Sequence, residues 1–504
     1  MKKENTVGAE LAAARVQRGA PAGASSGRAG AGVAENDYVI RVLDSPRQIR
    51  AEDWNALLAA QDPAGVLNPF MRHEYLAAML ESGSATQQTG WTARFFTLSR
   101  GGQLTGACAL YLKDHSYGEY VFDHAWANAY HQHGLPYYPK ALLAPPFTPV
   151  PGPRLLARDA AARSLLLKAL LAWCAEEKLS SLHLLFASED DILACQDAGL
   201  MLRHNVQFHW TNRAPTLFTS CNALPPEGAG LAWGGPALAA ATPTLLTSCN
   251  ALPPEGAGLA WGGPALAAAT PTLATACAAL PFENARFHDF DAFLASLSQD
   301  KRKKIRQERR KVAEAGVVFR WSLGQAISAS DWDFFYRCYA RTYYEHGNAP
   351  YLSRDFFRRM AETMPENWLL FVAEKAGQPI ATSLIAVSGQ PVRAGGQFDH
   401  QPTLKTAYGR YWGALERVDC LHFEACYYQP LQWCIEHGYD RFEGGAQGEH
   451  KMARALLPVK TTSAHWLAHP AFADAVERFL EREGEGIASY MQALERRNPF
   501  KVRS

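Results

Sequence analysis

The sequence lacks the patterns that mark several classes of protein. Its ten cysteines form no C-x-x-C pair and no cysteine–histidine spacing typical of a zinc site. No G-x-S-x-G string and no Cys/His pair at a known catalytic spacing marks an activated nucleophile. These absences argue against a metal site, a disulfide framework and covalent catalysis. They predict reduced core thiols in a cytoplasmic protein.

Secretion and membrane signals are missing as well. The N-terminal residues contain no apolar core of a signal peptide. The uncharged stretch 228–254 is long enough to cross a bilayer, but its glycines and prolines would break a helix. The net charge is only +1, so any electrostatic attraction must come from local clusters. We therefore expect no transmembrane segment and no DNA partner.

What is present is the pattern of an α/β protein. Residues 1–37 are rich in Ala, Gly, Arg and Ser and are expected to be a disordered tail. Strands then alternate with helices in two stretches, 38–214 and 287–504, which predicts an α/β (α+β) fold with two tandem domains. Each domain is expected to hold a mixed twisted sheet flanked by helices. Two similar halves suggest a ligand cleft between them.

A tandem repeat separates the two stretches. The text that begins at Pro215 restarts at Pro243 with one change, and a third partial copy begins at Pro271, a period of 28 residues. Solenoid repeats have such periods, but they diverge in sequence and carry a core pattern. This repeat is nearly identical between copies and rich in Pro, Gly and Ala. We interpret 215–286 as a recent duplication that forms an insertion or linker.

The first candidate site segment is 113–134, KDHSYGEYVFDHAWANAYHQHG, followed by YYPK. Its polar and aromatic residues follow no helix or strand period, and such irregular segments on a scaffold often carry function. A hydrogen-bonded network that packs the loop is the alternative. The candidates for substrate binding are Tyr117, Glu119, Asp123, Trp126 and Lys140.

The second candidate is the basic run 301–311, with eight basic residues in eleven. It could bind a CoA phosphate, a tRNA backbone or a lipid pyrophosphate. A solvated helix face is the alternative. The candidate anion-binding residues are Lys301, Arg302, Lys303, Arg306 and Arg309.

The third candidate combines GRYWG, LHFEACYYQPLQWCIEHG and EGGAQGEHK between residues 409 and 451. The glycines of the last string let backbone N–H groups approach a ligand. Acylation of an amine needs a base and a stabilised oxyanion, and this string offers acid, base and cation together. A charged turn is the alternative. The catalytic candidates are Lys451, Glu449, Glu443 and His450, and the substrate-binding candidates are Arg410, Tyr411, Trp412, His422, Glu424, Tyr428 and Gln447.

These motifs, in this order, resemble the FemAB-like family of bacterial proteins, labelled peptidoglycan biosynthesis/recognition and grouped with GNAT N-acetyltransferases. SYGEYVFD, KRKKIRQERR and GAQGEHK carry the resemblance, which spans 38–214 and 287–485. It implies two GNAT-like domains. Fem ligases pass an amino acid from aminoacyl-tRNA to a peptidoglycan precursor, and the resemblance implies that Lys451 steadies the tetrahedral intermediate. The repeat, and a longer segment before GRYWG, depart from the family pattern.

The function expected is an acyl- or aminoacyltransferase that acts on an amine, with a peptidoglycan precursor as a candidate acceptor. Glu449 or Glu443 would be the base, Arg410 and the basic run an anion clamp, and Glu119 with Asp123 the holders of the acceptor amine. The donor is aminoacyl-tRNA or acyl-CoA, and no tightly bound cofactor is expected. A non-catalytic binder of cell-wall precursor or RNA, and an acetyl-CoA-dependent N-acetyltransferase, are the alternatives. The usual GNAT pyrophosphate loop, Q/R-x-x-G-x-G/A, is not visible in either half.

Overall fold

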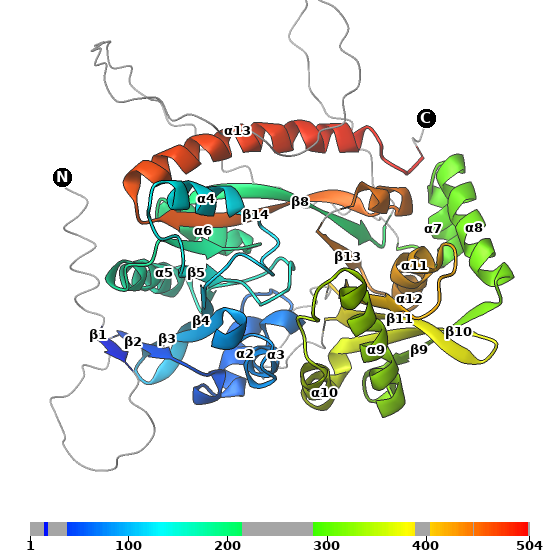
Figure 1. Ribbon diagram of the computed structural model, residues 1–504, viewed down its shortest axis with the longest axis horizontal. Helices are drawn as coiled ribbons and strands as arrows, with labels where there is room; N and C mark the ends of the chain where they lie inside the picture. Colours follow the sequence, from blue (N-terminus) through cyan, green and yellow to red (C-terminus); the bar gives the residue numbers. More distant parts are fainter. Residues whose placement is uncertain (1–14, 19–37, 214–285, 389–403, 447, 502–504) are drawn as a thin grey trace, which may run out of the picture. The chain divides into compact units, whose positions relative to one another are not determined.

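The computed structural model (Figure 1) describes residues 15–18, 38–213, 286–388, 404–446 and 448–501. All of these belong to one compact unit. The predicted repeat insertion lies outside the described residues except for its last position, and so does Gln447.

The first half alternates strands and helices as its hydrophobic pattern predicts. Short strand β1 (Arg15–Arg18) lies within the predicted N-terminal tail and pairs in parallel with β2. The other elements are β2 (Tyr38–Leu43), α2 (Ala51–Ala59), α3 (His73–Glu81), β3 (Trp91–Arg100), β4 (Gln103–Lys113), α4 (His124–Gln132), β5 (Lys140–Leu143), β6 (Leu156–Ala157), α5 (Ala160–Glu176), β7 (Ser181–Leu184), α6 (Glu189–Asp197) and β8 (Met201–Thr211).

The second half repeats this alternation. Its elements are α7 (Phe290–Ser296), α8 (Gln299–Glu314), β9 (Val317–Leu323), α9 (Ala329–Glu345), α10 (Arg354–Thr363), β10 (Trp368–Lys375), β11 (Gln378–Val387), β12 (Thr406–Ala414), α11 (Leu421–Phe423), a π-helical turn η6 (Glu424–Tyr428), α12 (Gln429–Glu436), β13 (Arg441–Ala446), the 3-10 helix η7 (Glu449–Arg454), β14 (Leu457–Leu467) and α13 (Pro470–Glu495).

The two halves share one mixed sheet of 14 strands. The order is β1-β2-β3-β4-β5-β7-β14-β8-β13-β12-β11-β10-β9, with β6 beside β4. Each half therefore receives the last strand of the other: β14 pairs with β7 of the first half, and β8 pairs with β13 of the second. β8 and β14 pair antiparallel to each other at the centre. The predicted α/β (α+β) class with two tandem halves is confirmed, and the halves are joined by this exchange.

Helices cover both faces of the sheet (Figure 1). On one face a hydrophobic core continues across both halves, because α2 and α3 of the first half share it with α9 and α10 of the second. On the other face α5 packs against the strands of the first half, while α7 and α12 cover those of the second. Helix α13 lies along β8 and β14 and packs on α4 through Val476 and Leu480. No helix in the described ranges is both long enough and apolar enough to span a bilayer.

Two expectations from the sequence need correction. Segment 113–134 is not irregular throughout, because 124–132 form helix α4, whose Trp126 and Tyr130 are buried. The mixed polar and aromatic residues hid its helical period. The sequence pattern also predicts a last helix over 470–483, but α13 continues to Glu495, twelve residues further. The cysteines in the described part of the chain are all free, and most are buried.

Candidate functional site

The candidate site begins where two parallel strands separate. β12 and β13 pair in parallel from Thr406 with Arg441 to Tyr408 with Glu443, and their pairing ends there. On their other sides β12 pairs with β11 from Ala407 to Ala414, and β13 pairs with β8 with a register shift between Glu443 and Ala446. Splayed strands leave backbone groups without a partner strand, and such groups can bind a ligand.

Glu443 lies at this separation and is buried. Its side chain contributes to the walls of two pockets, with volumes of about 540 and 200 Å³. Its Oε2 has no hydrogen-bond partner in the described structure. Burial raises the pKa of Glu443 to about 7, against the opposing charge of Arg441. A carboxylate that titrates near neutrality can accept a proton from a substrate at physiological pH.

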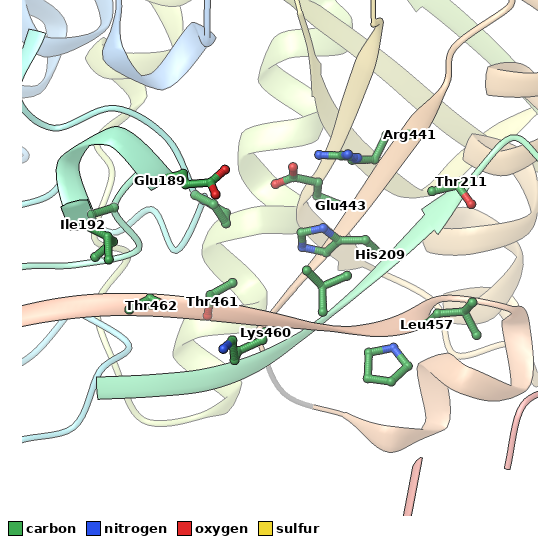
Figure 2. A pocket seen from close by; sticks show the side chains of 14 residues that line it. Glu189, Ile192, His209, Thr211, Arg441, Glu443, Leu457, Lys460, Thr461 and Thr462 are labelled. Carbon is green, nitrogen blue, oxygen red and sulfur yellow. The ribbon is translucent and has the colours of Figure 1, made fainter. Parts of the chain in front are cut away.

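The larger pocket is built from both halves (Figure 2). His209 from β8 lies beside Glu443 and Arg441 from β13, and Glu189 from α6 and Lys460 from β14 close the other side. The His209 Nε2 is 3.1 Å from the side-chain oxygen of Gln207. Burial lowers the pKa of His209 to about 3, so its ring is neutral near pH 7. Glu443 is therefore the group of this pair that can change charge near neutral pH.

Gly444 and Gly445 directly follow Glu443 at the irregularity within β13 where its pairing with β8 shifts register, and this local change of direction is the Gly444–Gly445 turn. Gly445 has φ 76°, a conformation that favours glycine. A Cβ on Gly444 would lie 2.3 Å from a methyl carbon of the buried Leu456 and 3.0 Å from the carbonyl oxygen of Phe208, so a larger residue would displace its neighbours. The buried Lys451, on η7, donates hydrogen bonds from Nζ to the carbonyl oxygens of Gly444 (2.6 Å) and Gly445 (3.3 Å). Burial lowers the pKa of Lys451 to about 8. Lys451 thus holds the turn beside the candidate base.

Two further pockets lie next to this turn and share Arg410 and Tyr411. The smaller, about 180 Å³, is lined by Gly444 and Gly445, and the larger, about 310 Å³, includes Trp412. The Arg410 Nη2 donates a hydrogen bond of 2.7 Å to the carbonyl oxygen of Phe147 in the first half.

The structure does not bring the other two catalytic candidates to Glu443. The Glu449 carboxylate accepts hydrogen bonds from Tyr490 (3.0 Å) and Arg497 (2.7 Å) at the C-terminal end of the chain. His450 lies 3.2 Å from the hydroxyl of Tyr427, in an aromatic cluster that includes His422. Burial lowers the pKa of His422 to about 4.

The first-half candidates do come together, but in a buried network centred on Lys140. The Lys140 Nζ contacts Glu119 Oε2 at 2.7 Å and also Asp123, with all three side chains buried. Trp126 packs on the neighbouring histidines. The two carboxylates expected to hold the acceptor amine therefore bind an amine of the chain itself. Tyr117 is separate from this network, with 65% of its surface exposed.

Two of the substrate-binding candidates, Glu424 and Tyr428, contact helix α8, which carries the basic run. Arg309 on α8 pairs with the buried Glu424 at 3.0 Å and donates to Gln432 at 2.9 Å. Tyr428, also expected to bind substrate, donates its hydroxyl hydrogen to Glu308. Arg306 lies 3.7 Å from Asp291. In the described ranges Lys301, Arg302 and Lys303 form no ion pair.

Sequence reasoning missed several residues around the pockets. His209 and Arg441 were not singled out, because a strand pattern does not show which of its polar residues face a cavity. The tyrosines on α9 carried a usable signal: Tyr339 and Tyr343 are four residues apart and share a helix face. No cluster of metal-ligating side chains occurs among the residues that the structure describes.

Several solved structures match this chain over most of its length at low identity. FemX is 10% identical, with 85% of this chain and 98% of that chain covered and a TM-score of 0.42. L-PGS from Bacillus licheniformis is 10% identical, with 86% and 97% covered and a TM-score of 0.42. A tandem GNAT protein from the clavulanic acid biosynthesis pathway is 10% identical, with 86% and 99% covered and a TM-score of 0.39. No match was found among curated proteins.

The family comparison covers most of the chain. The FemAB-like model, described as peptidoglycan biosynthesis/recognition, matches residues 45–220 and 266–502. The stretch between the two matched segments, 221–265, falls inside the predicted repeat insertion. These two segments make up well over half of the 504 residues, and the chain therefore belongs to the FemAB-like family.

Proposed function

We propose that this protein transfers an acyl or aminoacyl group to an amine, with Glu443 as the general base. The observation that carries the proposal is a buried carboxylate without a partner for Oε2, with a pKa of about 7, where two pockets meet. An amine reaches the enzyme mainly as its ammonium form and must lose a proton before it can attack a carbonyl. Membership of the FemAB-like family supports the transferase class, and the family description supports a peptidoglycan precursor as the acceptor.

The proposed reaction needs no covalent enzyme intermediate. Glu443 accepts a proton from the ammonium group, and the free amine attacks the carbonyl carbon of the donor. A C–N bond forms, the carbonyl oxygen becomes an oxyanion, and the ester or thioester bond then breaks. The proton on the new nitrogen passes to the leaving oxygen or sulfur. Because Glu443 is buried, its proton affinity is close to that needed at neutral pH.

Lys451 is a positioning residue in this proposal. Its ammonium group bonds two successive carbonyl oxygens, so it fixes the Gly444–Gly445 turn and places positive potential beside it. A fixed positive charge near the developing oxyanion lowers the barrier without reorganisation during the reaction. Glu449 is assigned no part, because Tyr490 and Arg497 hold its carboxylate.

The donor is proposed to be aminoacyl-tRNA or an acyl-CoA. Lys301, Lys303, Lys304 and Lys311 on α8 offer an accessible basic surface for its phosphates. Both candidate donors occur in the cytoplasm, which is where the reaction would take place.

The donor is identified by thermal unfolding with acetyl-CoA, charged tRNA and a soluble peptidoglycan precursor in separate samples. A ligand that binds only the native state raises the midpoint as its concentration rises. We expect a shift with one donor and with the precursor. A shift with the precursor alone, and no transfer in any combination, would favour a non-catalytic binder.

The base is tested by Glu443→Gln, which keeps the size of the side chain and removes its proton affinity. We expect kcat to fall by about 100-fold or more, because general bases contribute about 10²–10⁴-fold. Glu362→Gln, on the surface of α10, is the matched control and should leave turnover unchanged. A Glu443→Gln enzyme with full activity would exclude Glu443 as the base.

A further inference from the structure

The two pockets around Arg410 are distinct from those around Glu443. They share Tyr339, Tyr343, Tyr351, Arg410 and Tyr411, and their volumes are about 180 and 310 Å³. Aromatic rings dominate their walls, and Arg410 is their charged member. The smaller pocket is closed by Tyr120 and Phe147 from the first half and by the Gly444–Gly445 turn from the second.

The charge of Arg410 is not balanced within the described part of the chain. Its Nη2 donates to the carbonyl oxygen of Phe147 at 2.7 Å and approaches the Thr148 hydroxyl at 3.5 Å. Its Nε is buried without an acceptor, and no carboxylate in the described ranges pairs with it. The hydroxyl of neighbouring Tyr411 is also buried and interacts with the Arg410 guanidinium. A half-buried guanidinium without a counter-charge is costly, so this arrangement favours an anion in the pocket.

Backbone strain marks the same pocket. Tyr120 has φ 65° and Phe147 has φ 55°, and both lie in the left-handed region that side chains other than glycine rarely adopt. The ring of Phe147 stacks on Tyr351 of the second half, with a centroid distance of 4.9 Å and an angle of 7° between the planes. Strained residues persist where the surrounding structure holds them, and they are concentrated at ligand sites. Here they shape an aromatic wall opposite Arg410.

The chemistry of the pocket favours a carboxylate. A guanidinium offers a planar fork that matches a carboxylate, and aromatic walls suit the small apolar group that carries it. The phosphates of CoA or tRNA belong to large, strongly hydrated groups, for which the exposed lysines of α8 are better suited. The Gly444–Gly445 turn lines this pocket and directly follows Glu443, which lines the other two pockets, so an acceptor that reached from Arg410 to the base would pass along this turn.

We infer that Arg410 binds the free carboxylate of the amine acceptor, so that the acceptor is an amino acid or a peptide with an unblocked carboxyl group. This inference rests on the proposed transferase function and specifies its substrate class. Arg410 and the tyrosines select the acceptor at one end, and Glu443 deprotonates its amine at the other.

The test compares two probes that differ only in charge, N-acetylalanine and N-acetylalanine amide, with inorganic phosphate as a third. Binding to the full-length protein is measured by calorimetry. We expect the carboxylate to bind about tenfold or more tightly than the amide, because a charge-assisted pair is lost with the amide. Arg410→Gln should remove this preference. Arg94→Gln, on β3 beside Asp44, is the matched control and should retain it.

Three results would overturn the inference: equal binding of carboxylate and amide, absence of carboxylate binding, or tighter binding of phosphate. The comparison of probes on the unmodified protein does not depend on how well Arg410→Gln folds. The two proposals fail separately, because Glu443→Gln should lose turnover yet keep the carboxylate preference. If that variant stayed active while the preference was present, only the assignment of the base would fall.

Discussion

Glu443 imposes a cost on the native state that depends on pH. Its carboxylate is buried without a partner for Oε2, so the folded protein favours the protonated form. Its pKa is about 7 in the folded state, against an ordinary value of 4.5. Between these values the native state binds more protons than the unfolded chain, so the free energy of unfolding falls as pH rises through this window.

At the residue scale we predict that Glu443→Gln stabilises the protein at pH 8 by up to about 3 kcal/mol, since one pKa unit corresponds to about 1.4 kcal/mol. The gain should vanish below about pH 4.5, where the wild-type carboxylate is protonated in both states. Urea denaturation at several pH values measures it. Glu189→Gln, exposed in the same pocket, is the control and should show no such trend. Equal stability of Glu443→Gln and wild type at pH 8 would contradict the assigned burial cost.

At the element scale, helix α8 shows what a local pattern can and cannot predict. The helix and its dense basic charge follow from the residues alone. Its inward contacts do not, because Arg309 and Glu308 meet partners more than 100 positions away in the chain. The same limit applies to Glu424 and Tyr428 on η6. Their spacing places them on one face of a helix, but the sequence does not show that α8 is the helix they contact. Residue types at the candidate site could be predicted, whereas their burial and partners could not.

The buried ion pair between Glu308 and Arg454 connects α8 to the 3-10 helix η7, which also carries Lys451. The Glu308 carboxylate accepts hydrogen bonds from the Arg454 Nη2 at 2.9 and 3.1 Å and from the Tyr428 hydroxyl. We predict that Glu308→Ala lowers the free energy of unfolding by about 3 kcal/mol, because it leaves a buried guanidinium unpaired. Urea denaturation measures the loss. Glu314→Ala, exposed on the same helix, should change stability by less than about 0.5 kcal/mol. An equally small change in the free energy of unfolding for Glu308→Ala would show that this ion pair does not stabilise the contact between α8 and η7.

At the scale of the whole molecule, the exchange of β8 and β14 makes the two halves one structure. Strand β7 pairs with β14, which comes from the far end of the chain. The patterns MLRHNVQFHW (201–210) and TSAHWL (462–467) predict two strands but not which sheet each one joins, since pairing across such distances leaves no local signal. The fold class could therefore be read from the sequence, while the crossing of the halves could not. Glu443, the proposed base on β13, is placed by this crossing, because its neighbour β8 comes from the first half.

The same crossing explains how the chain can carry an insertion between its halves. Asn212, which follows β8, accepts a hydrogen bond from the backbone N–H of Phe287 at 3.2 Å, so the chain returns to the point where it left. The buried Asn212 also donates its backbone N–H to the carbonyl oxygen of Asp440 at 2.7 Å. The two ends of the insertion are therefore held close together by the fold.

We predict that deleting residues 243–270, one copy of the repeat, leaves turnover intact and changes the free energy of unfolding by less than about 0.5 kcal/mol, since loop-closure entropy varies slowly with length. Urea denaturation and the transfer assay measure both quantities. Asn212→Ala, which removes this side-chain contact and keeps the repeat, should instead cost about 1–3 kcal/mol, because the Phe287 N–H and the Tyr439 carbonyl oxygen lose their partner. A large loss of stability or turnover on deletion of the repeat would mean that the insertion contributes contacts of its own, and that it is more than a connection between two fixed ends.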